Sequence, residues 1–207
     1  MTMIPTLTPR AAREQTTFRT LLSSMSRPGS VSRLDLDGAN PLLVIAEALV
    51  DHEVTFAVAP ERRDLTEAIL RQTGSHVAGM DVAQYVFCDA DSLGHVLTEA
   101  ADGTWEYPDA GATVICLVPA ISQEPDATDY PLSPRKERGL GGEEALVLSG
   151  PGIRDTATVY VDGFRSEARR AFAERNAMRP LGLDLVLVTT DGALVSLTRY
   201  TSLQGEE

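Results

Sequence analysis

The stretch from Arg179 to Arg199, which reads RPLGLDLVLVTTDGALVSLTR, constrains the fold more than any other. Alternate residues of an extended chain point to opposite sides, and here both sides are apolar: Leu183, Leu185 and Leu187 on one, Val186 and Val188 on the other. A strand of this kind needs cover on both faces, as in the middle of a sheet packed between layers. We therefore predict that this run is a central strand.

A turn and a lone carboxylate accompany this strand. Asp191 and Gly192 tolerate positive φ, so they predict a two-residue turn that pairs residues 194–198 with the first run as a hairpin. Asp184 lies inside the apolar run, where its carboxylate must find hydrogen-bond donors or face a cleft. The sequence is compatible with both a satisfied structural aspartate and a functional one.

The rest of the chain alternates between predicted helices and strands. Helices are expected from Pro9 to Arg27, from Pro41, from Pro60 to Gly74, near residues 93–99 and from Asp162 to Met178; strands are expected at 31–36, 54–58, 85–88, 112–118, 145–148 and 156–161. This order predicts an α/β fold, with a mixed, largely parallel sheet covered by helices on its faces and a C-terminal β-hairpin. Residues 119–144, rich in proline and glycine, are predicted to form a long mobile loop.

Length and charge narrow the function. A chain of 207 residues fits one domain, 1–207. The formal net charge of −12 argues against nucleic acid as a partner. Apolar runs such as 112–118 are too short to span a membrane, and Pro5 and Pro9 interrupt the region where a signal peptide would need its apolar stretch. We therefore expect a cytoplasmic protein.

Arginine supplies almost all of the positive charge. Two stretches, 10–33 and 165–179, each hold five arginines and few acids, whereas Lys136 is the sole lysine. Such stretches are usually solvated helix faces, and the alternative is a shared phosphate-binding surface. We find no phosphate-binding glycine motif, nucleophile elbow or zinc motif in the sequence, and Cys88 and Cys116 are expected to be buried, inert thiols.

Six segments, in order, resemble one family, the H subunit of the bacterial carbon-phosphorus (C-P) lyase system, PhnH. They are QTTFRTLLSSMSRPG at 15–29, LVDHEVTF at 49–56, TG at 73–74, PDAGAT at 108–113, LSGPGI at 148–153 and PLGLDL at 180–185. The resemblance covers nearly the whole chain. Two motifs depart from the family: residues 198–201 read TRYT where the family usually has PRTT, and Arg179 stands before PLG where the family usually has phenylalanine.

The resemblance implies a subunit for alkylphosphonate catabolism, linked to the formation of ribose 1-methylphosphonate 5-triphosphate from ATP and a phosphonate. It also implies a homodimer that joins PhnG, PhnI, PhnJ and PhnK, with PhnL acting in the same step. The fold implied is similar to that of pyridoxal-phosphate-dependent transferases, without the cofactor. The residues of this chain agree with the absence of the cofactor. Pyridoxal phosphate needs a lysine for its Schiff base, and the sole lysine, Lys136, lies in the proline- and glycine-rich segment.

Two main hypotheses follow, and no catalytic, cofactor-binding or metal-binding residue is assigned. The first is an assembly or accessory subunit without a complete catalytic apparatus. The second is a ligand-binding or catalytic subunit in which Arg19, Arg71 and Arg199 hold phosphate or phosphonate oxygens, with Glu53 and Asp184 as polar partners. Surface ion pairs are the alternative role for each arginine. A third hypothesis is a pyridoxal enzyme that uses Lys136.

Overall fold

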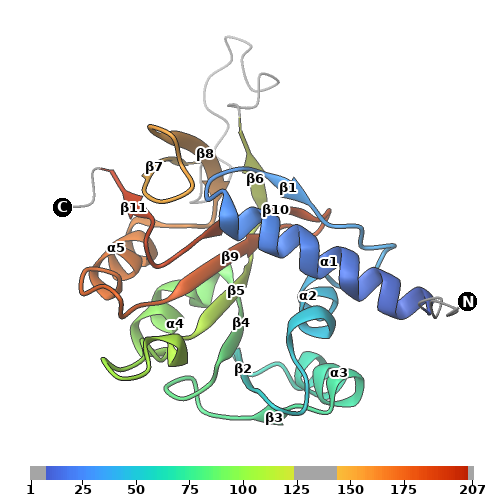
Figure 1. Ribbon diagram of the computed structural model, residues 1–207. Helices are drawn as coiled ribbons and strands as arrows, with labels where there is room; N and C mark the ends of the chain where they lie inside the picture. Colours follow the sequence, from blue (N-terminus) through green and yellow to red (C-terminus); the bar gives the residue numbers. More distant parts are fainter. Residues whose placement is uncertain (1–7, 124–143, 205–207) are drawn as a thin grey trace, which may run out of the picture.

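The computed structural model describes residues 8–123 and 144–204, which form an α/β fold (Figure 1). The α-helices are α1 (Pro9–Ser26), α2 (Pro41–Leu49), α3 (Arg63–Thr73), α4 (Leu93–Glu99) and α5 (Ser166–Arg175), with 3₁₀ turns at Ala90–Ser92 and Pro108–Ala110. The strands are β1 (Ser32–Arg33), β2 (Thr55–Ala59), β3 (His76–Val77), β4 (Tyr85–Asp89), β5 (Thr113–Leu117), β6 (Ala120–Ser122), β7 (Glu144–Ser149), β8 (Ala157–Asp162), β9 (Asp184–Val188), β10 (Ala193–Leu197) and β11 (Ser202–Leu203).

The larger sheet confirms the predicted central strand. Among the described residues its strand order is β1-β10-β9-β5-β4-β2-β3, so β9 lies between its hairpin partner β10 and the parallel strand β5. Strands β9, β5, β4, β2 and β3 are parallel to one another, whereas β10 pairs antiparallel with β9 on one side and with β1 on the other. Residues 185–188 of β9 are at most 1% exposed. The mixed, largely parallel sheet is therefore present.

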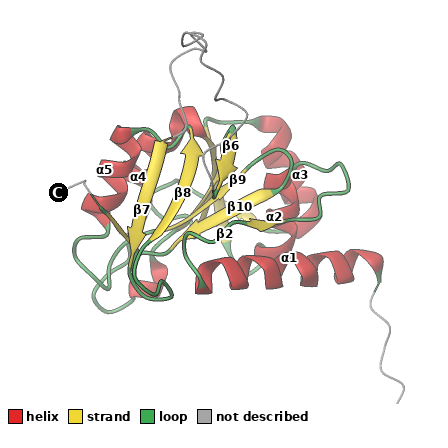
Figure 2. Cartoon of the chain, turned by 90° about the horizontal axis from the view of Figure 1, so that it is seen from above, coloured by secondary structure: helices red, strands yellow, loops and turns green. Residues whose placement is uncertain are grey.

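Both faces of this sheet are covered, as the two-sided apolar pattern requires. On one face Val186 and Val188 of β9 pack with side chains of α1, α2 and α3. On the other face Leu185 and Leu187 pack with α4, α5 and a second sheet. Figures 1 and 2 show these layers on either side of the strands. The two arginine-rich stretches include α1 and α5, and these two helices lie on opposite faces of the sheet, so the helices themselves do not form a shared surface.

The hairpin turn differs from the prediction by one residue. Thr189 donates its backbone N–H to the carbonyl of Ala193 at 2.9 Å, which leaves three residues in the loop. Gly192 adopts φ +86°, but Asp191 does not have positive φ. A three-residue loop places one left-handed residue after an ordinary turn, and glycine takes that position at low cost. The two-residue turn is therefore wrong, although the hairpin itself is confirmed.

A second sheet was not predicted. Strands β11-β7-β8-β6 form an antiparallel sheet, in which β7 and β8 follow each other in the chain while β6 and β11 come from distant segments. Strand β6 (Ala120–Ser122) and the start of β7 at Glu144 fall inside the segment that we predicted as a loop over 119–144. That prediction was too wide at both ends. Residues 124–143, including Lys136, lie outside the described residues.

The N-terminal helix begins as predicted. The Thr8 side chain accepts a hydrogen bond from the Ala11 backbone N–H at 3.2 Å, and Pro9 takes the first helical position. Two other helix starts were placed too early: α3 begins at Arg63 rather than at Pro60, and α5 at Ser166 rather than near Asp162. Within the residues that the structure covers, no helix is long and apolar enough to cross a membrane.

Candidate functional site

A row of polar side chains crosses the larger sheet at one end of its strands. Thr113 of β5 pairs with Tyr85 of β4 and with Asp184 of β9 in the strand register. The next row on the same face consists of Phe87, Ile115 and Val186, which belong to the core beneath α1, α2 and α3. The polar row lies at the amino ends of these parallel strands. Burial raises the pKa of the Tyr85 phenol, and the nearby Asp51 carboxylate raises it further.

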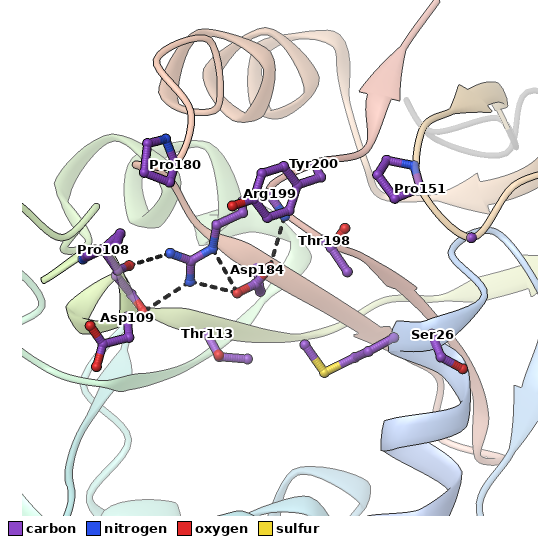
Figure 3. A pocket seen from close by; sticks show the side chains of 13 residues that line it. Ser26, Pro108, Asp109, Thr113, Pro151, Pro180, Asp184, Thr198, Arg199 and Tyr200 are labelled. Atoms are coloured by element: carbon purple, nitrogen blue, oxygen red, sulfur yellow. Dashed lines mark hydrogen bonds and ion pairs between the residues drawn. The ribbon is translucent and has the colours of Figure 1, made fainter. Parts of the chain in front are cut away.

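A cavity of about 650 Å³ opens above part of this row (Figure 3). Its walls come from the end of α1, the segments 108–113 and 151–152, the start of β9 and the chain after β10. The lining residues are Met25, Ser26, Pro108, Asp109, Gly111, Thr113, Pro151, Gly152, Pro180, Asp184, Thr198, Arg199 and Tyr200. The volume is within the range of small-molecule pockets, but the cavity is open to solvent on one side.

An ion pair between Asp184 and Arg199 lies in this cavity. The Arg199 guanidinium donates to Asp184 Oδ2 from Nη2 at 2.7 Å and from Nε at 3.1 Å, and the Arg199 backbone N–H donates to Asp184 Oδ1 at 2.8 Å. Both side chains are largely buried, at 12% and 14% exposure. Asp184 therefore satisfies both sequence-based expectations at once: its carboxylate has donors, and it faces a cleft.

The remaining donors of Arg199 bind the chain as well. Nη1 donates to the carbonyl oxygen of Pro108, and Nη2 also reaches that of Gly111 at 3.5 Å. All three guanidinium nitrogens thus donate to protein oxygens (Figure 3). The side chain joins the loop before β5 to the start of β9 and the end of β10. In this arrangement Arg199 is a neutralised cross-link rather than a free cation.

The chemistry of the other lining groups is mixed. Three prolines and Met25 give apolar walls, and Ser26, Thr113 and Thr198 supply hydroxyls. The remaining charged group of the lining is the carboxylate of Asp109, so the lining residues themselves carry an excess of negative charge, although Arg154 and Arg179 lie just outside them in the sequence. Such a site does not favour a phosphonate, because an anion needs unpaired donors and positive potential. Apolar or hydroxyl-bearing groups fit it better.

The structure does not bring together the other residues that we named as candidates. Arg19 lies on the exposed side of α1, and Arg71 lies in the exposed last turn of α3. Glu53 is exposed in the link between α2 and β2. Of the five named residues, the cavity contains Arg199 and Asp184. The phosphate-holding role of the set stays a prediction.

The carboxyl ends of the parallel strands are a second place to look for a site. Open α/β sheets usually bind ligands at the carboxyl ends of two neighbouring strands whose following connections run to opposite sides. Here the two strands that follow β2 in the chain, β3 and β4, lie on opposite sides of it. At this edge Arg62 pairs with Asp89 at 3.4 Å and with Asp64 at 3.6 Å. Ion pairs thus occupy the carboxyl ends of β2 and β4. The cavity at the amino ends of β5 and β9 is therefore the better candidate for a binding site.

Apart from Asp184 and Arg199, the lining residues were not among the candidate site residues named from the sequence. Most of them nevertheless lie in segments that carry the family resemblance. Four of the six segments that carry the family resemblance contribute to the cavity: 15–29, 108–113, 148–153 and 180–185. The sequence could have predicted that these four segments lie together only on the assumption that segments shared with a family form one site. The chain end after β10, with Thr198 and Tyr200, completes the lining.

Together the fold and the site define an α/β protein with an open, partly apolar cavity whose buried arginine is internally paired. Comparisons with known proteins then give the family. The model of the family described as bacterial phosphonate metabolism protein (PhnH) matches residues 5–204. The chain belongs to this family.

Two relatives agree with that assignment. The chain is 31% identical over 199 residues to the putative C-P lyase subunit protein HtxG of Stutzerimonas stutzeri, covering 95% of this chain and 89% of the relative. It is 26% identical over 201 residues to the alpha-D-ribose 1-methylphosphonate 5-triphosphate synthase subunit PhnH of Rhizobium meliloti, covering 93% and 90%. The resemblance found in the sequence is thereby confirmed.

Proposed function

We propose that this chain is an accessory subunit of the C-P lyase machinery for alkylphosphonate catabolism. It takes part in the formation of ribose 1-methylphosphonate 5-triphosphate from ATP and a phosphonate, and it acts mainly in assembly. Family membership and the printed names of both relatives support this pathway. The homodimer and the association with PhnG, PhnI, PhnJ, PhnK and PhnL belong to the same proposal, as does a cytoplasmic location.

The ion pair between Arg199 and Asp184 is the observation that best supports an accessory role. A phosphonate or triphosphate would have to compete with the Asp184 carboxylate for the same guanidinium, and it would do so beside the carboxylate of Asp109. Forked hydrogen bonds to an anion need donors that are free to point at it. The geometry around the cavity therefore supports a structural role for Arg199 better than substrate binding.

A surface for a second copy is suggested by α1. Phe18 and Leu22 lie one turn apart on its outer side and are 47% and 58% exposed. Large apolar side chains at this spacing are typical of helix faces that pack against a partner. We propose that this face forms part of the homodimer contact, which a Leu22→Glu variant should weaken in sedimentation measurements.

Co-expression tests the proposed function. The other C-P lyase subunits are produced with and without this chain, and the assembly is analysed by sizing and by its turnover of ATP and methylphosphonate. We expect the chain to enter the assembly and to be required for turnover, while the chain alone turns over nothing. Turnover by the isolated chain would refute the accessory role.

The ligand-binding alternative predicts a different outcome. Calorimetry of the isolated chain with ATP or methylphosphonate should then give measurable heat that Arg19→Ala, Arg71→Ala or Arg199→Ala reduces. A pyridoxal enzyme would instead show the absorbance of a bound aldimine that Lys136→Ala abolishes. The implied likeness to pyridoxal-phosphate-dependent transferases stays a prediction.

A further inference from the structure

Large apolar side chains are exposed on the loops that frame the cavity. Trp105 and Tyr107 are each 64% exposed and lie three residues and one residue before the lining residue Pro108. Met178, at 62%, lies two residues before Pro180, and Tyr200, at 40%, lines the cavity itself. Aromatic residues and methionine are enriched where proteins bind each other, because they bury much area with little loss of freedom. Their gathering at one cavity therefore indicates an interaction surface.

The loop 103–111, here called the aromatic–acidic loop, is held in a fixed shape. Thr104 and Tyr107 exchange backbone hydrogen bonds at 3.1 Å in both directions, and Asp102 forms a β-bridge with Gly111. Arg199 donates to the carbonyl oxygens of Pro108 and Gly111 and so ties the loop to the chain after β10. The exposed rings are thus carried by an ordered loop. A surface that is ordered before binding loses less entropy when a partner arrives.

The charge of this loop selects the partner's chemistry. Glu106 and Asp109 are exposed, and in the described part of the chain neither carboxylate forms an ion pair. The loop contains no lysine or arginine. Arg154 and Arg179 flank other walls of the cavity, and Arg179 donates to Ser202 at 2.8 Å. An arginine from a partner could stack on the Trp105 ring and pair with a neighbouring carboxylate.

We propose that the aromatic–acidic loop and the cavity beside it are the docking site for an arginine-bearing apolar segment of another C-P lyase subunit. The apolar side chains of that segment enter the cavity between Pro108, Pro151 and Pro180, and its arginine lies over Trp105. A second copy of this chain is the poorer occupant of this surface, because its proposed contact lies on α1 and because two copies of the loop would bring the carboxylates of Glu106 and Asp109 together without a lysine or arginine. This inference rests on the proposed function and names the surface through which it acts.

Co-purification with the other subunits tests the docking site. The full-length chain is co-expressed with a tagged partner assembly as the wild type, as Trp105→Ala and as the double variant Glu106→Gln/Asp109→Asn. The matched control is Val82→Ala, because Val82 is also 64% exposed but follows β3 at the far edge of the larger sheet. We expect Trp105→Ala to weaken retention at least about tenfold, as for an interface hot spot. The double variant should weaken it less and remove part of its salt sensitivity.

Trp105 also provides a direct signal, because it is the sole tryptophan of the chain. Its emission should shift to shorter wavelength when the partner assembly is added to the purified chain, and Val82→Ala should show the same shift. Circular dichroism confirms that each variant is folded, which is expected since the changed side chains are exposed.

The outcomes separate the two proposals. If the wild type does not bind the assembly, the proposed function fails. If the wild type binds and Trp105→Ala binds equally well, the docking site is wrong while the accessory role stands. A concentration-dependent shift of Trp105 emission in the isolated chain would assign the surface to a second copy and would likewise overturn the inference.

Discussion

Replacing Arg199 with alanine should destabilise the protein strongly. The substitution leaves the Asp184 carboxylate, which is 14% exposed on its side chain, without the guanidinium that neutralises it. It also removes a donor from the carbonyls of Pro108 and Gly111. Removing one partner of a buried ion pair costs about 3–5 kcal/mol. Because this pair keeps some contact with water, we expect the lower end, about 3 kcal/mol of unfolding free energy.

Urea unfolding followed by circular dichroism measures this loss. The midpoint should fall without a change in slope, and the melting temperature should drop by about 6–12 °C, since 1 kcal/mol corresponds to about 2–4 °C in a domain of this size. Arg33→Ala is the matched control: Arg33 Nη1 contacts Asp191 Oδ2 at 2.9 Å, but the two side chains are 66% and 63% exposed. That variant should lose less than about 1 kcal/mol.

A second variant tests the geometry of the pair rather than its charge. Arg199→Lys keeps the cation but cannot donate to Asp184 and to both carbonyls at once, so its stability should lie between wild type and Arg199→Ala. The reasoning is refuted if Arg199→Ala unfolds at the same urea concentration as Arg33→Ala. In that case water or a shifted backbone would have to satisfy Asp184.

Three further results are expected. Asn176→Ala should lower the unfolding free energy by about 2–4 kcal/mol in urea, since its buried amide donates to the Leu183 carbonyl at 3.2 Å and accepts from the Leu183 N–H at 2.7 Å; an unchanged midpoint would contradict this. Iodoacetamide should leave both cysteines of the native protein unmodified in mass spectra and label them in urea, because burial, and then the Cys88 thiol, raise the pKa of Cys116; rapid native labelling would be inconsistent. Burial raises the pKa of Tyr85, so its contribution to stability holds below the ordinary value of about 10 and is lost as pH rises through the folded value; Tyr85→Phe should flatten the alkaline loss of stability in urea titrations, and an unaltered slope would exclude the effect.

The central hairpin could be predicted because its sequence pattern is unambiguous. Apolar residues on both faces of 183–188 allow one position, inside a sheet covered on each side, and β9 takes it. Gly192 allowed the place of the turn to be predicted but not the length of its loop. A glycine in the left-handed region occurs in two-residue and in three-residue hairpin loops.

The site was harder to predict because it depends on contacts between distant segments. Asp184 and Arg199 were both named, yet their pairing depends on how the chain turns after β10, where the Thr201 N–H donates to the Thr198 carbonyl at 2.8 Å. Arg19 and Arg71 looked equivalent to Arg199 in the sequence, since each is an arginine near apolar residues. Arg19 and Arg71 lie on helix faces that point to solvent, whereas Arg199 is largely buried. The periodicity of the sequence did not show which of the three arginines would be buried.

The second sheet escaped prediction for a related reason. The alternation in β7 and β8 indicates strands, but it does not say which sheet they join. Strand β6 comprises three residues after Pro119, too few for any periodic signal. Its partner β8 lies beyond the segment that separates β6 from β7, so the pairing is non-local.

The neighbouring positions of β5 and β9 bear on how the chain folds as it is synthesised. Leu117 leaves the ribosome long before Asp184, and until β9 follows, the edge of β5 that β9 will cover has no strand beside it. An apolar strand edge left open in a nascent chain invites association with other chains. Completion of the larger sheet must therefore await the final residues, and translation stopped before Asp184 should yield an aggregation-prone fragment.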